Sequence, residues 1–456
     1  MRVVRILLVL AVVLFFGNSS AQNTDRYWVF GDSAGIDFSN LVSPIPAVSM
    51  LQTRGTCASV CDSVGNLLFY SGTPLVPLYL SGGAINWGYA ANKNHQVMQN
   101  GDTLVGSGWY QEMVIVSDPG DQQQYYIFCS GELEPTNGLY YSKVDLNYNN
   151  GLGKVIQKNI QLNTDSITDG ITAVRHGNGR DWWVLVRNWK GVDQYTNDVM
   201  VYYVSPNGVQ LHSIQQIGIP ASKESVLRLK FNSDGSKLYN VSARGIIERF
   251  DFDRCTGLLS NETTYEGLSG PPYKFYWGFE VSPDESKLYV SSIYQTANFD
   301  SSYLIQFDLN ASNFAASADT LYTFSNDLPG LLQKGPDNKI YLSTMSVSPD
   351  TCFDYLFCYN NTNSTNSSLP PSKDFKNPKR TKTKKASVRK RGDQSGHKGH
   401  ARKLFESSQA DEIIKCVWSC PLKPIHDFLK LLYAKTVAVT TFLIPYGATP
   451  VVIKIS

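Results

Sequence analysis

The amino-acid sequence predicts an all-β protein and, within that class, a β-propeller. A unit of strand, tight polar turn and strand recurs along the chain. Gly, Tyr, Phe and Trp are plentiful (35, 26, 21 and 8), whereas charged residues make up only 18% of the chain. That composition suits many short strands joined by glycine-containing turns. We expect about six or seven four-stranded blades within residues 22–345. The sequence leaves open whether these blades close a full ring.

The recurring unit is the main support for this fold. Its clear copies are FNSDGSKLY at 231–239, VSPDESKLY at 281–289 and KGPDNKIY at 334–341, with turn aspartates 50 and 53 residues apart. Weaker copies lie at 61–70, 117–128 and 175–186. Asp-Gly, Asp-Glu or Asp-Asn between two strands is a hairpin signature. A solenoid would need a shorter period, and two sandwiches would not repeat the turn in phase.

The first 21 residues predict an export signal. Two arginines precede an unbroken apolar run of 11 residues, Ile6–Phe16, and small residues follow at Ser19 and Ala21, where a signal peptidase reads. The run is too short to span a bilayer as a stable helix, although an uncleaved anchor is the alternative. We therefore expect an exported chain, secreted or held at the cell surface or in the periplasm, with no transmembrane anchor after cleavage.

The C-terminal part is strongly basic. Between Lys373 and Lys403 there are 13 Lys or Arg and 2 acidic residues, so a net charge of +2 for the whole chain leaves −9 for the rest. We expect a linker at 346–372, a disordered basic segment at 373–410 and an unassigned segment at 411–456. The basic side chains expected to neutralise nucleic-acid phosphates are Lys379, Arg380, Lys382, Lys384, Lys385, Arg389, Lys390 and Arg391.

Cysteine and acidic patterns predict no metal and no cofactor. Eight cysteines are too few for a disulfide-dense scaffold. Cys57–Cys61 and Cys352–Cys358 could each form a bridge, but spacing does not decide pairing. Cys416 and Cys420 with a nearby histidine lack a fourth ligand. The repeated turns carry one acidic residue, or two in the copy with Asp284 and Glu285, and a calcium loop needs several closely spaced oxygen ligands.

Several segments carry a family resemblance: WVFGDSAGIDF at 28–38, GNLLFY at 65–70, NHQVMQNG at 94–101, GLYYSKVD at 138–145 and HGNGRDWW at 176–183. With the Ser-Pro-Asp turns, they resemble the secreted, WD40-like propeller proteins of Bacteroidetes, a group often attached to type IX secretion or gliding-motility sorting domains. The resemblance covers about residues 25–345. It implies a secreted or cell-surface protein with a binding or adhesive role. No sorting domain follows, and the last blade is expected to stop near Met345.

The tail carries a second resemblance. Residues 363–374 and the string GDQSGHKGH at 392–400 are similar to the N-terminal region of insertion-sequence transposases with a zinc-finger-type DNA-binding module. In that family a Cys-x-x-Cys pair follows the Gly-His-Lys-Gly-His string. Here three residues separate Cys416 from Cys420, and no second pair follows. The resemblance implies a transposase fragment, joined to the propeller gene or placed there by an assembly artefact.

The string FGDSA at 30–34 is similar to the Gly-Asp-Ser block of a lipase/esterase family, in which Ser33 would be the nucleophile. Such a serine needs a base and a carboxylate that orients the base. That family supplies them as Asp-x-x-His, but no histidine of this chain has an aspartate three residues before it: His95, His176, His212, His397, His400 and His426. The strand pattern also lacks α/β alternation. We expect a strand turn here and no enzyme.

His176 lies in a glycine-rich turn without a carboxylate or cysteine partner in the sequence pattern, and we expect a turn residue. The sequence thus predicts a non-catalytic, exported binding or adhesion module for a glycan or a protein that it does not identify. Two alternatives stay open. In one, the transposase-like tail binds DNA and is the working part. In the other, the chain is an esterase that acts through Ser33.

Overall fold

The computed structural model describes residues 24–74, 87–106, 111–131, 137–188, 196–221, 227–243, 245–266, 274–294, 301–324, 327–346, 353–359, 372–375, 413–416 and 418–419. The expected signal segment lies outside them, and so do nearly all of the basic segment and the C-terminal segment. The chain divides into two compact units, Met1–Ser269 and Gly270–Ser456, which we call unit 1 and unit 2.

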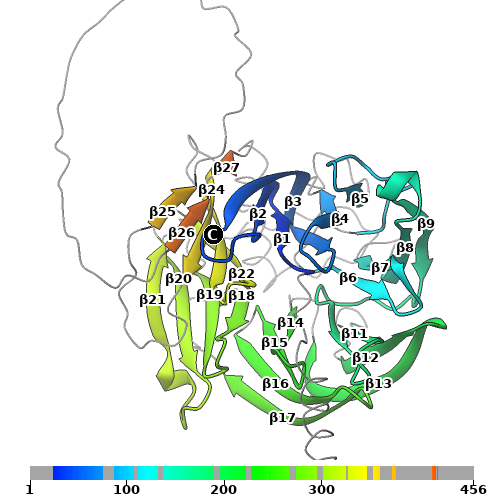
Figure 1. Cartoon of the computed structure of the whole chain (residues 1–456). Helices are drawn as coiled ribbons and strands as arrows, with labels where there is room; N and C mark the ends of the chain where they lie inside the picture. Colours follow the sequence, from blue (N-terminus) through cyan, green and yellow to red (C-terminus); the bar gives the residue numbers. More distant parts are fainter. Residues whose placement is uncertain are drawn as a thin grey trace, which may run out of the picture. The chain divides into compact units, whose positions relative to one another are not determined.

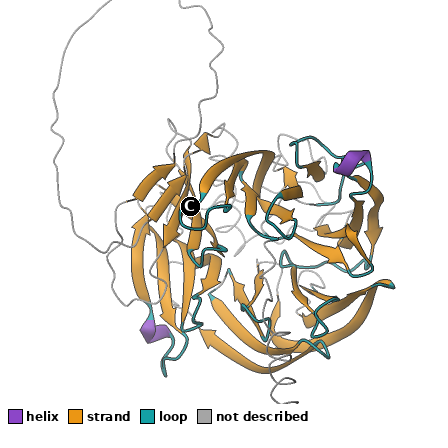
Figure 2. Ribbon diagram, viewed as in Figure 1, coloured by secondary structure: helices purple, strands orange, loops and turns teal. Residues whose placement is uncertain are grey.

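Nearly all regular structure in the described residues is β-strand (Figure 2). Five sheets are four-stranded and antiparallel, a further sheet has five strands, and one is a two-stranded parallel pair. The all-β class and the β-propeller of four-stranded sheets are therefore confirmed, with about five blades, slightly fewer than the six or seven expected. Two 3-10 helices, η1 (Asn149–Gly151) and η2 (Ala315–Ser317), are short additions.

Unit 1 contains four sheets in chain order (Figure 1). Sheet 1 is β1 (Tyr27–Phe30), β2 (Asp32–Asp37), β3 (Ile45–Cys61), β4 (Leu67–Pro74) and β5 (Tyr89–Asn92). Sheet 2 is β6 (Met113–Asp118), β7 (Asp121–Gly131), β8 (Gly138–Asp145) and β9 (Lys154–Gln161). Sheet 3 is β10 (Thr172–Arg175), β11 (Trp182–Arg187), β12 (Thr196–Ser205) and β13 (Gly208–Ala221). Sheet 4 is β14 (Leu227–Phe231), β15 (Lys237–Ser242), β16 (Ile246–Asp253) and β17 (Leu258–Glu266).

Unit 2 contains sheet 5, with β18 (Lys274–Val281), β19 (Lys287–Tyr294), β20 (Ser301–Asp308) and β21 (Asp319–Phe324). Sheet 6 has β22 (Asp327–Lys334), β23 (Ile340–Ser346), β24 (Phe353–Tyr359) and β27 (Trp418–Ser419). The parallel pair is β25 (Ser372–Phe375) and β26 (Ile413–Cys416). Strand β24 pairs with β23, so the last sheet continues past Met345 into the range where a linker was expected.

The hydrophobic cores of unit 1 lie between successive sheets. On β11, Val184 and Val186 enter the core shared with sheet 2, whereas Trp183 and Leu185 enter the core shared with sheet 4. Side chains alternate between the two faces of a strand. Because both faces of this sheet are covered, β11 is apolar at nearly every position rather than at every second one.

Successive sheets of each unit meet along one strand apiece, as the innermost strands of propeller blades do. In unit 1, β3, the third strand of sheet 1, contacts β6, and the first strands of sheets 2 to 4 follow: β6 contacts β10, and β10 contacts β14. In unit 2, β18 contacts β22 so closely that glycine is required. At Gly278 a Cβ atom would lie 2.8 Å from the carbonyl oxygen of Gly330. The Ser291 hydroxyl joins these strands, since it accepts the Gly278 N–H at 2.9 Å and donates to the Gly330 carbonyl at 2.6 Å.

The repeated turns are hairpin turns, as the sequence predicts. In each clear copy the residue directly after the turn aspartate has a positive φ: 75° at Gly235, 58° at Glu285 and 61° at Asn338. The aspartate before it accepts the backbone N–H two residues later, at 2.8 Å for Asp234 and 3.1 Å for Asp284. The carboxylates therefore close the turns, which accounts for the aspartate that the three copies share.

Two features bear on the sequence predictions. The described cysteines whose side chains are placed are free thiols: Cys57, Cys61, Cys129 and Cys255. Burial raises the pKa of the Cys57 thiol to about 12, so it stays protonated at neutral pH. Within the described part of the chain, no helix is long and apolar enough to cross a membrane.

A buried ion pair joins sheets 3 and 4. Arg187 Nη1 lies 2.8 Å from Glu248 Oε2, and both side chains are 2% exposed. The second guanidinium nitrogen donates to the Ile219 carbonyl at 2.6 Å, and Glu248 accepts the Ile219 N–H at 2.5 Å. Asn240 also donates to Glu248. Removing either ionic partner would leave an uncompensated buried charge.

We expect Arg187→Met to lower the free energy of unfolding by about 3–5 kcal/mol. The double variant Arg187→Met/Glu248→Leu should lose clearly less than the sum of the two single variants, because it buries no lone charge. Urea denaturation followed by circular dichroism measures both, with Lys93→Met, at an exposed position, as the control. Additive losses would contradict the proposed coupling.

Candidate functional site

The sequence-predicted positions fall into two groups. The signal segment, the eight basic residues from Lys379 to Arg391 and three of the histidines, His397, His400 and His426, lie outside the described residues. Ser33, His95, His176 and His212 are described. The structure therefore tests the placement of the esterase and histidine candidates only.

Ser33 is the second residue of β2 and lies in the tight bend between the paired residues Phe30 and Ala34. Its φ is 66°, and Gly31 has a φ of 55°. The described histidines are engaged elsewhere: His95 with the Tyr70 hydroxyl, His176 with the Asn178 N–H and His212 with the Thr256 carbonyl. In the described part of the chain, Ser33 makes no hydrogen bond to a histidine or a carboxylate. Its local geometry is that of the expected turn.

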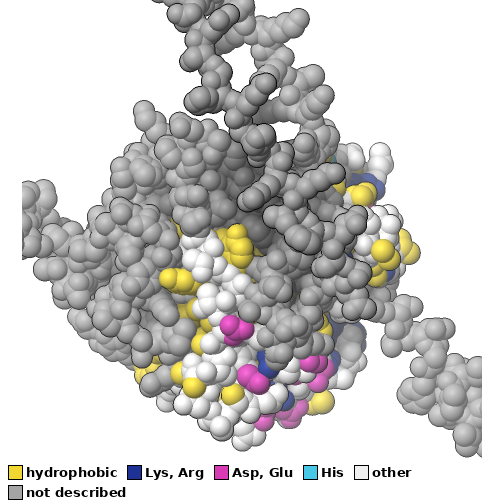
Figure 3. All heavy atoms as spheres, turned by 90° about the vertical axis from the view of Figure 1, so that its left-hand side faces the viewer, with side chains coloured by type: hydrophobic (Ala, Val, Ile, Leu, Met, Phe, Trp, Pro, Cys, Tyr) yellow, Lys and Arg dark blue, Asp and Glu magenta, His cyan; other side chains and the backbone are white. Residues whose placement is uncertain are grey.

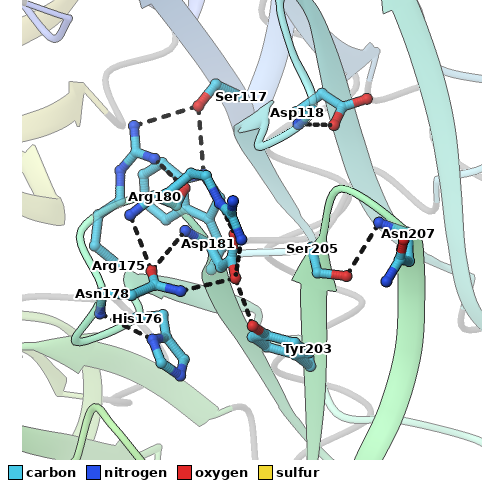
Figure 4. A network of polar contacts seen from close by, with 12 residues as sticks. Ser117, Asp118, Arg175, His176, Asn178, Arg180, Asp181, Tyr203, Ser205 and Asn207 are labelled. Atoms are coloured by element: carbon cyan, nitrogen blue, oxygen red, sulfur yellow. Dashed lines mark hydrogen bonds and ion pairs between the residues drawn. The ribbon is translucent and has the colours of Figure 1, made fainter.

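His176 belongs to a dense polar cluster in unit 1, where the β10–β11 turn meets sheet 2 and strand β12 (Figure 4). We call this cluster the Asp181 network: Ser117, Arg175, His176, Asn178, Arg180, Asp181 and Tyr203. Sequence analysis singled out only its histidine. The turn string HGNGRD at 176–181 contains four of the seven residues, so the signal was present but was assigned to turn formation alone.

Asp181 is the centre of this network. Its side chain is 0% exposed, and Arg180 Nε lies 2.7 Å from Oδ1. Asn178 Nδ2 donates to Oδ2 at 2.8 Å, and the Tyr203 hydroxyl donates to the same oxygen. The hydrogen bond from Arg180, with those from Tyr203 and Asn178, lowers the pKa of Asp181 from 3.8 to about 2, although burial acts in the opposite direction. The carboxylate is therefore ionised at neutral pH.

Arg175 and Ser117 connect the turn to sheet 2. The Arg175 guanidinium carbon lies 3.9 Å from the ring centroid of Trp182, a cation–π contact. Its Nη2 donates to the Ser117 hydroxyl oxygen at 3.3 Å, and the Trp182 indole N–H donates to the same oxygen at 3.4 Å. Figure 4 shows Ser117 and Arg175 turned toward each other. A serine beside a cation has no base to take its proton.

Aromatic rings surround His176 on the other side. The His176 ring centroid lies 5.1 Å from that of Trp183 and 5.5 Å from that of Tyr203. The His212 ring lies 4.9 Å from that of Trp183. His176 Nδ1 accepts the Asn178 N–H at 2.9 Å, so this nitrogen is not turned toward the Asp181 carboxylate. The arrangement is not a catalytic triad, in which a carboxylate must orient the imidazole.

Arg254 fixes the same turn to sheet 4. Its Nε donates to the Arg175 carbonyl at 2.8 Å. Its own carbonyl accepts the Gly177 N–H and the Trp183 indole N–H, each at 2.8 Å. The β10–β11 turn is therefore bonded to sheets 2 and 4 as well as to its own sheet, which makes it a rigid element.

A second polar cluster lies where the first strands of unit 1 begin. Gln111 bonds the main chain of β14 with both ends of its amide: Nε2 donates to the Leu229 carbonyl at 2.6 Å, and Oε1 accepts the Leu229 N–H at 3.1 Å. Beside it, Arg228 Nη1 lies 3.5 Å from Asp169 Oδ2, with both side chains 4% exposed. Glu112 is fully buried and accepts a hydrogen bond from Thr56.

Sequence analysis missed this second cluster, although it had a signal. The clearest case is Arg228, a charged residue between Leu227 and Leu229. Charged residues are rarely buried without a partner, so a charge within an apolar strand indicates an internal ion pair. Among the described residues, no group of three or more His, Cys, Asp or Glu side chains could hold a metal ion.

Exposed charges do not form one large patch on the face that Figure 3 displays. Acidic and basic side chains of described residues lie there among uncharged ones. In the Asp181 network, Asp181 pairs with Arg180, while Arg175 is a further cation that lies against the Trp182 ring; beside the network, Asp118 pairs with Lys143 at 2.6 Å. The network is a polar and aromatic surface rather than a strongly charged one.

No model of a known protein family matches the sequence, and no curated protein matches it. Solved structures with a similar fold include a protein from Lactobacillus plantarum, 12% identical with a TM-score of 0.45, covering 74% of this chain and 92% of that one. A periplasmic gluconolactonase from Pseudomonas aeruginosa is 13% identical with a TM-score of 0.47, covering 74% and 91%. The β-propeller domain of Cps50 (Swd1) from Myceliophteria thermophila is 10% identical with a TM-score of 0.39, covering 72% and 96%.

These likenesses carry no argument about what this chain does, because identity and TM-score are both low. The propeller fold alone does not decide between a binding and a catalytic role, because one fold can host unrelated functions.

The depressed pKa of Asp181 makes the turn sensitive to acid. A carboxylate whose folded-state pKa lies near 2 contributes stability above the unfolded value of about 3.8 and loses it as pH falls toward 2. We expect the wild type to be more stable than Asp181→Asn above pH ~4, and this difference to shrink by on the order of 1–2 kcal/mol near pH 2. Urea denaturation of both proteins at several pH values measures the difference. Parallel pH profiles would refute the assignment.

Proposed function

We propose that this chain is an exported β-propeller that acts as a binding or adhesion module and catalyses no reaction. Its ligand would be an extracellular glycan or protein that contacts the Asp181 network. The observation that carries this proposal is a 60% exposed guanidinium, that of Arg180, held by a carboxylate, that of Asp181, which is itself fully buried. An exposed donor on a fixed base is what a recognition surface needs.

The surroundings of Arg180 support a binding role. Trp182 and Tyr203 are half-buried, and Asn207 is exposed on the adjoining β12–β13 turn. Arginine, tryptophan and tyrosine are the residues that dominate binding energy at interfaces. Because the turn is bonded to three sheets, little conformational entropy is lost when a ligand binds.

Export is supported by the N-terminal apolar run and by the resemblance to secreted WD40-like propellers of Bacteroidetes. The non-catalytic role is supported by the bonding of the candidate nucleophiles. Ser117 accepts hydrogen bonds from a cation and an indole, and Ser33 has no base beside it in the described part of the chain.

We expect Arg180→Gln to weaken ligand binding at least tenfold, because interface arginines contribute about 2 kcal/mol or more. Glutamine keeps a donor for Asp181, so the melting temperature should change little. Binding is measured on an array of neutral and acidic glycans and on intact cells. Lys93→Gln, at an exposed position outside the network, should bind as the wild type does. Equal binding by Arg180→Gln would remove the network from the ligand site.

The same preparations test the hydrolase alternative. We expect no turnover of short-chain p-nitrophenyl esters. Turnover that Ser33→Ala abolishes and Ser39→Ala retains would replace the binding proposal with an esterase acting through Ser33. Ser39 serves as the control because it is exposed and follows the same β1–β2 hairpin.

The charge of the tail favours a second, weaker activity. With +11 between Lys373 and Lys403, the segment would bind nucleic acid through its phosphates without sequence preference. The resemblance to a transposase fragment suggests the same chemistry. In an exported protein this activity would seldom meet DNA, so we place it after the binding role.

Replacing all eight basic residues from Lys379 to Arg391 with glutamine should abolish salt-sensitive binding to duplex DNA. Replacing the lysines among them with arginine should retain it, since the contacts depend on charge. Filter binding between 50 and 200 mM salt measures the loss, which should reach roughly 10³-fold or more for the wild type if six or more phosphates are contacted. DNA binding that survives the glutamine variant would move the site to the propeller.

A further inference from the structure

Three tyrosine hydroxyls hold an irregular segment of strand β3. The ladder between β2 and β3 passes from Ala34↔Val48 to Asp32↔Gln52, so residues 49–51 have no ladder partner on β2. The main chain around Met50 is bonded by side chains instead. The Tyr70 hydroxyl accepts the Met50 N–H at 3.0 Å, and the Tyr89 hydroxyl donates to the Met50 carbonyl at 3.0 Å.

Tyr27 adds the third contact, since its hydroxyl donates to the Val48 carbonyl at 3.3 Å. We call these three side chains the tyrosine clamp: Tyr27, Tyr70 and Tyr89. The clamp acts at the point where β3 changes partner, because residues before the irregular segment pair with β2 and residues from Thr53 onward pair with β4. Releasing the clamp would remove these side-chain bonds from the main chain of residues 48–50.

His95 controls the proton of the central clamp residue. Its Nδ1 lies 3.1 Å from the Tyr70 hydroxyl oxygen. That oxygen already accepts the Met50 N–H, so its own proton is the one that reaches His95. Neutral His95 with its proton on Nε2 therefore satisfies the network. A proton on Nδ1 would turn this acceptor into a donor and leave the Tyr70 O–H without its partner.

Among the described residues, no carboxylate offsets a charge on His95. Burial alone lowers the pKa of His95. Of the acidic groups around the cluster, Asp37 acts on Tyr27, and Asp25 and Asp62 act on Cys61. Lys93 in the same turn is a cation and opposes a second positive charge.

The tyrosines and thiols of the cluster do not change charge near neutral pH. Burial raises the pKa of Tyr27 and Tyr89 to about 12, and it raises that of Tyr70 as well. The thiols of Cys57 and Cys61 also have pKa values of about 12. His95 is therefore the group of this cluster that gains a proton when a solution is made mildly acidic.

We propose that His95 and the tyrosine clamp form a pH-sensitive latch: protonation of His95 removes the acceptor of the Tyr70 hydroxyl proton, weakens the hold of Tyr70 on Met50 and loosens residues 45–51 of β3. The direction follows from the preference of the folded state for neutral His95. At pH 7 and above, His95 is neutral and the latch is closed. It opens as the pH falls below about 6.5, the ordinary pKa of histidine. This inference does not depend on the proposed ligand or on export.

Amide hydrogen exchange of the intact protein tests the latch. After correction for the intrinsic rate, we expect protection of residues 45–51 to fall about tenfold or more between pH 7.5 and 5. Protection of β11 (Trp182–Arg187), which has no contact with the clamp, should stay constant over this range. A flat profile for residues 45–51 in the wild type would overturn the proposal.

Two variants separate the latch from general acid sensitivity. In His95→Gln the amide oxygen accepts the Tyr70 proton at every pH, so the pH dependence of residues 45–51 should disappear. In Tyr70→Phe protection of these residues should be low at every pH. If a variant does not fold, the wild-type protein alone still tests the latch. In its NMR spectrum, the Met50 amide resonance must shift with pH with the same midpoint as the His95 ring resonances. Different midpoints, or pH dependence that persists in His95→Gln, would refute the latch.

Discussion

The fold depends on the need of each sheet to cover two apolar faces at once. A four-stranded sheet such as sheet 3 has Val184 and Val186 on one face and Trp183 and Leu185 on the other, and each set is buried by a different neighbour. Because burial of apolar area is the dominant stabilising term, no such sheet is stable alone. Serial stacking of sheets, with their first strands side by side, follows from that constraint.

This constraint explains how much of the fold the sequence could predict. The hairpins follow from the aspartate turns. The residue after each aspartate needs a positive φ, which Gly235 and Asn338 adopt readily. Four-stranded units follow from the spacing of those turns. The number of blades was set slightly too high, because the period counts turns and does not show how strands divide among sheets. Strand β3 illustrates this, since it pairs with β2 along one part and with β4 along another.

The candidate site was much less predictable. The sequence placed His176 in a glycine-rich turn, and the turn is real, but the network also depends on Ser117, which is 58 residues from its partner Arg175, and on Tyr203, which is 22 residues from its partner Asp181. Contacts over such separations depend on which sheets become neighbours, and local pattern carries no information on that. The same holds for Arg187 and Glu248, whose ion pair spans two sheets. The sequence shows the charged residues, but it does not show which of them pair.

These polar contacts also fix how each sheet is oriented against the next, which the apolar cores do not. Apolar burial is non-directional, so it favours stacked sheets without fixing how one is turned against the next. Hydrogen bonds require a defined distance and angle. In unit 1, Gln111 with Leu229 and Arg187 with Glu248 place such bonds at the junctions between sheets, and Arg254 does so at the β10–β11 turn. A surface made of turns from several sheets keeps its shape only if those sheets keep their positions. The buried polar links are therefore the physical condition for any recognition by the Asp181 network.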